Sequence, residues 1–205
     1  TRRPSARAIA GAAERLRRGG VVAFPTDTVY GIGASAFRPA AIRRLYRLKR
    51  RDRSKPLAVL VEGVAAAAPL IREIPVQAKP LIARFWPGPL TLILPASSLG
   101  VMVTGGRPTI GIRAPGGAVA RAFLRACGVP VAATSANASG KPAAISAAAV
   151  RAAFGKSVDC VLDGGRTDLA EESTVVDATR FPFRLLREGA GAAAMKALLK
   201  RRGIL

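Results

Sequence analysis

Short apolar runs alternate along the chain with longer segments whose apolar residues recur every three or four positions. The short runs predict buried strands at residues 21–24, 56–61, 90–94, 109–113, 129–133, 158–162, 174–177 and 184–186. The longer segments predict helices at residues 5–18, from 39 onward, after 61, and at 76–85, 116–126, 146–154 and 192–200. A Gly-rich loop is expected at 97–108. Strands that alternate with helices indicate the α/β class with a mixed sheet.

One segment places polar side chains directly after the first predicted strand. Thr26, Asp27 and Thr28 follow Pro25, which is expected to end the strand. Ligand-binding residues of α/β proteins are often found where a strand leaves the sheet. Gly31 and Gly33 are expected to act as backbone hinges. Asp27 is expected to be structural, and a capped turn would explain this segment equally well by itself.

The composition adds a strong positive charge. The chain has 33 Lys and Arg against 12 Asp and Glu, a net charge of +21, and no histidine. Such a field attracts the phosphates of nucleic acids or nucleotides, although a solvated Arg-rich surface would have the same composition. Without histidine, Ser-His-Asp and Cys-His catalysis and the usual zinc sites are excluded. No Walker-type phosphate loop is present, and the Gly-x-Gly at 31–33 lies too far after its strand for a dinucleotide fold.

Residues 1–205 are interpreted as a single domain with a sizeable core. No apolar run approaches the ~20 residues that span a bilayer. The Arg- and Ala-rich residues 1–18 resemble a transit peptide, but Glu14 and the direct run into the first strand favour an amphipathic helix. Cys127 and Cys160 predict no disulfide framework, and inert core thiols in a reducing, cytoplasmic setting are expected.

Further polar groups follow other predicted strands and helices. Residues 49–55 hold five cations in seven positions, and Arg113 ends a strand. Lys and Arg offer point charge and forked donors to phosphates and carboxylates. The segment 134–140 adds small donors with little bulk. Each feature alone could be a capped turn or a surface cation, and the whole set could be a basic nucleic-acid-binding surface.

Several short motifs occur along the chain: FPTDTVYGIG at 24–33, KRR at 49–51 with KPL at 55–57, FWPGPLT at 85–91, IRAP at 112–115, TSANASG at 134–140, STVVD at 173–177 and LREG at 186–189. In this order they resemble the motifs of the YrdC/TsaC family of threonylcarbamoyl-AMP synthases in its short, single-domain form. The resemblance runs from about residue 8 to 190. It implies an α/β sandwich around a twisted mixed parallel/antiparallel sheet with a basic concave face. The longer family members carry an additional C-terminal domain.

The resemblance also implies a reaction. L-threonine, bicarbonate and ATP would give threonylcarbamoyl-AMP and pyrophosphate, for the t6A modification of tRNA, with Mg2+ accompanying ATP. The enzyme would be a nucleotidyltransferase whose product passes to downstream t6A transferase proteins. No protein ligand set for a metal is expected.

The family's site residues are carried over by position. Lys49 and Arg51 are expected to be catalytic. The implied threonine contacts are Thr28, Leu60, Arg113, Ala133 and Ser173. The implied ATP contacts are Arg51, Lys55, Thr109, Ser135, Asn137, Ala143 and Arg187. Ala143 can add no side-chain hydrogen bond, and Lys55 stands where some family members have a neutral side chain.

Two other functions stay open at this point. A non-catalytic protein could bind tRNA or double-stranded RNA through the same basic face, although only 5% of the residues are aromatic and stacking platforms are scarce. A relative with the same fold could instead adenylate another acid or be inactive. The presence of both Lys49-x-Arg51 and Ser135-x-Asn137 favours the synthase.

Overall fold

Nine strands form one mixed sheet in the computed structural model, which describes residues 4–138 and 140–204. Their order across the sheet is β7-β1-β2-β6-β3-β5-β4-β8-β9, with both parallel and antiparallel pairs. The α/β class with a mixed sheet is confirmed. The strands are β1 Val22–Pro25, β2 Tyr30–Ser35, β3 Ala58–Leu60, β4 Leu90–Pro95, β5 Thr109–Arg113, β6 Val131–Ser135, β7 Cys160–Val161, β8 Thr174–Asp177 and β9 Arg184–Arg187. Ser139 and the first three residues lie outside the described residues.

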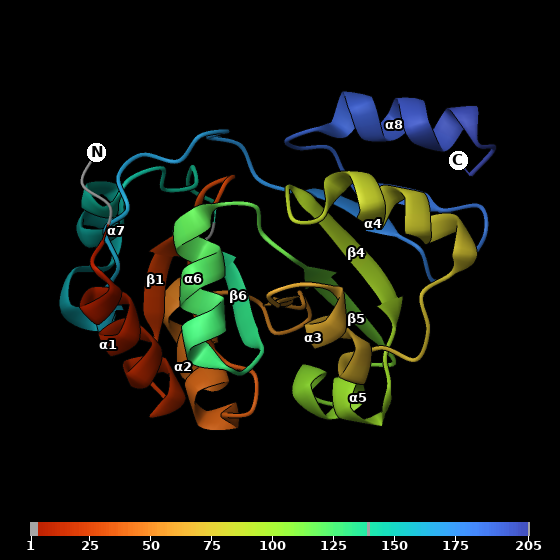
Figure 1. Ribbon diagram of the computed structural model, residues 1–205. Coiled ribbons are helices and arrows are strands. Elements are labelled where there is room, and N and C mark those ends of the chain that lie inside the picture. The colour runs from red at the N-terminus through yellow and green to blue at the C-terminus, as the bar shows by residue number, and fades with distance from the viewer. Residues whose placement is uncertain (1–3, 139, 205) are drawn as a thin grey trace.

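The helices cover the sheet in two groups (Figure 1). Helices α1 and α6 lie side by side over the half of the sheet that contains β1 and β6, while α4 and α8 lie over the half that contains β4. The α-helices are α1 Ala6–Arg17, α2 Pro39–Lys49, α3 Val64–Ala67, α4 Lys79–Phe85, α5 Ser98–Thr104, α6 Ala118–Cys127, α7 Ala147–Phe154 and α8 Ala192–Arg201. Single 3-10 turns occupy Ala68–Leu70, Val76–Ala78 and Gly155–Ser157.

Both faces of β1 are buried, which explains its continuous apolar sequence. Val22 and Phe24 belong to the apolar cluster beneath α1 and α6, and the rings of Phe24 and Phe123 lie 4.7 Å apart. Ala23 points the other way and joins the larger cluster, because successive side chains of a strand face opposite sides.

Gly31 and Gly33 are not hinges, so that expectation is wrong. Both lie inside β2, which the sequence pattern did not reveal, and neither has a positive φ. A Cβ at Gly33 would lie 2.7 Å from Val131 Cγ1 and 3.0 Å from the Ala132 carbonyl oxygen, both on the neighbouring strand β6. Glycine is required there because the surface of β6 comes too close for any side chain.

The loop expected at 97–108 contains a helix, α5. The Ser97 hydroxyl accepts a hydrogen bond from the Gly100 N–H at 3.1 Å, and Gly105 ends the helix with φ +72°. Gly100 therefore lies within a short helix, and only Gly105 and Gly106 mark its end. By contrast, the predicted first helix is confirmed as α1, capped by Ser5.

No helix in residues 4–138 and 140–204 combines the length and apolar character needed to cross a membrane. Both cysteines are free; Cys127 is buried, whereas Cys160 is only partly so. Burial raises the pKa of the Cys127 thiol to about 12 and also raises that of Cys160. A high thiol pKa disfavours the reactive thiolate, in agreement with the expectation of unreactive thiols.

Candidate functional site

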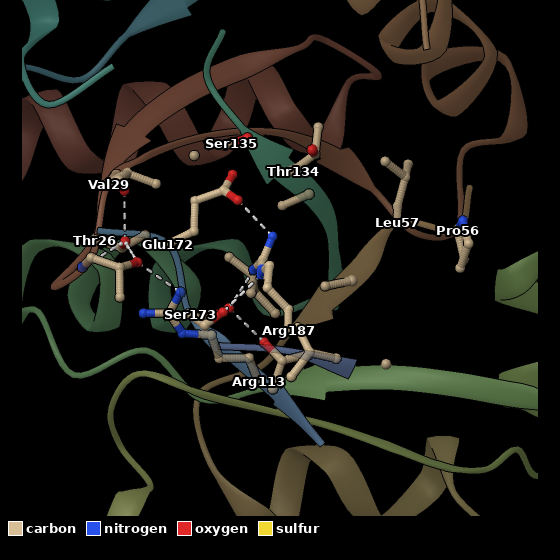
Figure 2. A pocket seen from close by; sticks show the side chains of 18 of the residues that line it. Thr26, Val29, Pro56, Leu57, Arg113, Thr134, Ser135, Glu172, Ser173 and Arg187 are labelled. Carbon is tan, nitrogen blue, oxygen red and sulfur yellow. Dashed lines mark hydrogen bonds and ion pairs between the residues drawn. The ribbon is translucent and has the colours of Figure 1, made fainter. Parts of the chain in front are cut away.

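A pocket of about 400 Å³ opens on the sheet and is lined by residues from β2, β3, β4, β5, β6, β8 and β9 (Figure 2). Most of the residues that the sequence singled out line it together. The residues expected to contact threonine and those expected to contact ATP share this one cavity. They are Thr28, Lys49, Arg51, Leu60, Thr109, Arg113, Ala133, Ser135, Asn137, Ser173 and Arg187.

These residues lie at both ends of the central strands of the sheet. Leu60 and Arg113 end the parallel strands β3 and β5 and pair with each other, and Leu60 also pairs with Val131 at the start of β6. Ser135 lies at the other end of β6, paired with Gly31 near the start of β2. Thr109, Gly111 and Arg113 of β5 all line the pocket, as do alternate residues of β3 and β6, so the cavity lies across one face of the sheet and reaches both ends of these strands.

Arg113 is the centre of a buried polar cluster. Its guanidinium donates to Asp27 Oδ1 at 2.6 Å, to Thr28 Oγ1 at 2.8 Å and to the Gly88 carbonyl oxygen at 3.0 Å. Burial lowers the pKa of Arg113, and the adjacent Asp27 carboxylate opposes this shift. These bonds fix the guanidinium plane and leave further N–H groups free to bind a carboxylate or phosphate.

Thr28 is completely buried within this cluster. Its hydroxyl also lies 2.9 Å from that of Thr26, which donates to the Val29 carbonyl oxygen at 2.6 Å. The turn between β1 and β2 is thereby held in one conformation against Arg113.

A second polar cluster surrounds Ser173, at the start of β8. Its hydroxyl lies 2.9 Å from Thr91 Oγ1 and accepts a hydrogen bond from Arg187 Nη2 at 3.0 Å. Arg187 also donates to the Ser173 carbonyl oxygen at 2.9 Å and to the Glu172 carboxylate at 2.7 Å. Two residues expected at different substrates are therefore in direct contact.

Lys49 ends α2 and is buried beneath the loop that follows β6. Its ammonium donates to the Ser135 carbonyl oxygen, to Asn137 Oδ1 at 3.0 Å and to Thr134 Oγ1 at 3.3 Å. The Ser135 hydroxyl donates to the same Asn137 oxygen at 2.7 Å. Lys49 and the Ser135-x-Asn137 pair thus form one hydrogen-bonded unit.

The pKa of Lys49 is lowered to about 8, mainly by burial and also by the charge of Arg51, while the charge of Glu172 opposes this shift. An ammonium held by neutral oxygens at the edge of a cavity keeps much of its field, because little water screens it. Lys49 is well suited to attract phosphate oxygens.

Arg51 holds the basic loop in place. Its guanidinium donates to the carbonyl oxygens of Lys55 and Pro56 at 3.1 and 2.9 Å. The side chain of Lys55 is exposed and does not line the pocket. Ala143 does not line it either, so the ATP contacts expected of these two residues stay predictions.

The structure adds pocket residues that the sequence did not single out. Glu172 lines the pocket immediately before Ser173, and Thr91 lies at the end of the FWPGPLT motif. Glu172 directly precedes the STVVD motif, and Thr91 is the last residue of FWPGPLT. The contact of Thr91 with Ser173 and that of Glu172 with Arg187 depend on strand pairing between β4, β8 and β9.

The pocket does not resemble a protein-built metal site. Within the described residues no group of three or more His, Cys, Asp or Glu side chains is placed to hold a metal ion. Glu172 is the only carboxylate among the described pocket residues, and it is bonded to Arg187. Mg2+ prefers oxygen ligands in octahedral geometry, which this side-chain set does not supply.

Comparison with protein families gives one match over most of the chain. The family model Sua5_yciO_yrdC, described as telomere recombination, matches residues 14–189. The threonylcarbamoyl-AMP synthase of Pyrococcus abyssi is 43% identical over 179 residues, which cover 87% of this chain and 53% of that protein. The putative threonylcarbamoyl-AMP synthase of Mycobacterium leprae is 41% identical over 185 residues, covering 90% of this chain and 84% of that protein. The chain spans about half the length of the P. abyssi and Bacillus subtilis relatives.

Solved structures agree with this result. The crystal structure of P. abyssi Sua5 complexed with L-threonine superposes with a TM-score of 0.87 at 42% identity, over 92% of this chain and 56% of that one. The structure of Escherichia coli YciO superposes with a TM-score of 0.82 at 27% identity, over 91% of each chain. The motifs, the twisted mixed sheet and these matches lead to the same conclusion: the chain belongs to the Sua5/YciO/YrdC family.

Proposed function

We propose that the protein is a nucleotidyltransferase that makes threonylcarbamoyl-AMP and pyrophosphate from L-threonine, bicarbonate and ATP. The observation that carries this proposal is the shared pocket. Arg113 and Thr28 line the same cavity as the Lys49–Asn137–Ser135 cluster, so an amino acid and a nucleotide could lie next to each other. The relatives named threonylcarbamoyl-AMP synthase and the L-threonine complex of P. abyssi Sua5 support it.

The threonine carboxylate would bind the free N–H groups of Arg113. The hydroxyls of Thr28 and Ser173 would orient the amine or side chain, with Leu60 and Ala133 in backbone or van der Waals contact. The ATP contacts would come from Arg51, Lys55, Thr109, Ser135, Asn137, Ala143 and Arg187. A carbamate formed on the threonine amine would attack the α-phosphate, and pyrophosphate would leave.

Such a displacement depends mainly on alignment and charge neutralisation, so neither a histidine base nor a covalent nucleophile is needed. Lys49 and Arg51 would stabilise charge on the pyrophosphate side. Mg2+ would arrive with ATP as part of that substrate, held by phosphate oxygens and water, because the pocket supplies no ligand cage.

Pyrophosphate release tests the proposal directly. The complete mixture of ATP, bicarbonate, threonine and Mg2+ should release pyrophosphate, and omission of threonine or of bicarbonate should stop it. Release that is independent of threonine, or that another amino acid supports better, would favour a relative that adenylates a different acid. The product would serve t6A formation on tRNA and pass to downstream transferase proteins in the cytoplasm.

An RNA-binding role for the basic surface is the alternative. It predicts an affinity for tRNA or double-stranded RNA that falls steeply with salt, without threonine-dependent pyrophosphate release. The buried hydrogen bonds of Lys49 and Arg113 favour the enzyme, since both cations face the pocket rather than an open surface.

A further inference from the structure

The charges around the pocket are strongly unequal. Four cations line it: Lys49, Arg51, Arg113 and Arg187. Among the pocket residues that the structure describes, Glu172 alone carries a negative charge. A pocket of this kind suits phosphates and carboxylates, but it repels any cationic group of a substrate everywhere except near Glu172.

Glu172 is held in the pocket by Arg187. Figure 2 shows the two side chains directed toward each other, with Glu172 reaching between Arg187 and the turn that contains Thr26 and Val29. The Oε2 atom accepts the hydrogen bond from Arg187 Nη1 at 2.7 Å, and 35% of the side chain remains exposed.

The carboxylate has acceptor capacity left. An ionised carboxylate can accept several hydrogen bonds, and within residues 4–138 and 140–204 the Oε1 atom accepts none. This free oxygen belongs to the residue next to Ser173, in the pocket that also contains Arg113.

We infer that Glu172 accepts a hydrogen bond from the α-ammonium group of the amino-acid substrate, and later one from the N–H of its carbamate. The inference rests on the proposed function and names a binding residue that the family motifs did not provide. An amino acid is a zwitterion, and Arg113 can neutralise only its carboxylate. A charge-assisted hydrogen bond from the ammonium to Glu172 neutralises the other end and fixes the nitrogen that must react.

Two other roles for Glu172 make different predictions. It could bind the ribose hydroxyls of ATP, as carboxylates do in nucleotide sites. It could also serve only to orient Arg187. Either role would affect ATP binding and would be indifferent to the presence of an amine on the other substrate.

Equilibrium binding of two ligands separates these roles without any turnover. The ligands are L-threonine and (R)-3-hydroxybutanoate, which has the same carboxylate and hydroxyl but no amine. The variant is Glu172→Gln, which keeps an oxygen acceptor for Arg187 and removes the charge. Glu171→Gln is the matched control, because Glu171 is exposed and lies outside the pocket.

Wild type and Glu171→Gln should prefer threonine over 3-hydroxybutanoate. Glu172→Gln should bind threonine roughly ten- to a hundredfold more weakly, which corresponds to the loss of a hydrogen bond between charged groups. Its equilibrium affinities for 3-hydroxybutanoate and for ATP should stay within about twofold of wild type. Should Glu172→Gln not fold, as judged by its melting transition, Glu172→Asp replaces it, with weaker threonine binding and unchanged 3-hydroxybutanoate binding expected.

Equal weakening of the binding of both ligands, weaker ATP binding with unchanged threonine affinity, or no preference for threonine in wild type would each overturn the inference. Failure of the proposed function is recognised separately, as the absence of threonine-dependent pyrophosphate release from the wild-type protein.

Discussion

Arg113 and Asp27 form an ion pair inside the protein: Arg113 Nη2 lies 2.6 Å from Asp27 Oδ1, and the two side chains are only 7% and 12% exposed. Asp27 follows β1 and Arg113 ends β5, so the pair joins strands that are not neighbours in the sheet. The other carboxylate oxygen of Asp27 is buried and has no hydrogen-bond partner among the residues that the structure describes. The pair therefore orients the guanidinium while leaving the acid itself incompletely satisfied.

Asp27→Ala should lower the free energy of unfolding by about 3–5 kcal/mol, because it leaves a buried guanidinium without its counter-charge. Urea denaturation followed by circular dichroism measures the change. Glu62→Ala is the control, since it breaks the exposed ion pair with Arg125 and should cost only about 0–1 kcal/mol. Equal losses for the two variants would contradict the structural role assigned to Asp27.

The buried ammonium of Lys49 should make stability depend on pH. Its pKa is lowered mainly by burial, to about 8, whereas the unfolded lysine titrates near 10.5. Between these values the unfolded state binds more protons, so the wild-type free energy of unfolding should rise with pH relative to Lys49→Met. The difference between the two proteins should change by up to about 3 kcal/mol from pH 8 to pH 10.5.

Denaturation curves at several pH values across this range would measure that slope. Lys156→Met, which removes an exposed lysine, provides the control and should give no comparable slope. If the free energy of unfolding of wild type relative to Lys49→Met instead falls as the pH rises, the folded state stabilises the ammonium and the prediction is wrong.

Gly33→Ala should destabilise the protein by about 1–3 kcal/mol, because the added methyl group would meet β6. Gly11→Ala is the matched control, for which the opposite effect on stability is expected. Gly11 lies in α1 with no atom within 4 Å of an added Cβ, so alanine should stabilise the helix by about 0.5–1 kcal/mol. Thermal melts of the two variants should therefore shift in opposite directions.

Arg51→Ala should reduce threonine-dependent pyrophosphate release by at least about 10²-fold, the usual cost of removing a group that stabilises developing charge. The fold should persist, as a near-wild-type melting temperature would show. Arg53→Ala, in the same basic loop but with an exposed side chain, should retain activity. Near-wild-type release by Arg51→Ala would remove Arg51 from the proposed mechanism.

Most strands and helices could be predicted from periodicity, because β1, β5 and α1 each carry an unambiguous apolar pattern and clear end signals. Strand β2 was missed because its glycines look like a loop, and its extended conformation follows from pairing with β1 and β6. Helix α5 was missed because its segment is short and rich in glycine, although Ser97 and Gly105 provide local end signals.

Residue type and short motifs were enough to predict the α/β class, the positive charge and the identity of most pocket residues. How these residues meet follows from the tertiary structure. Strand pairing places alternate residues of β3, β5 and β6 on one face around a single cavity, Arg113 pairs with Asp27, and Glu172 pairs with Arg187. Such relationships depend on contacts between residues far apart in the chain, and no local pattern records them.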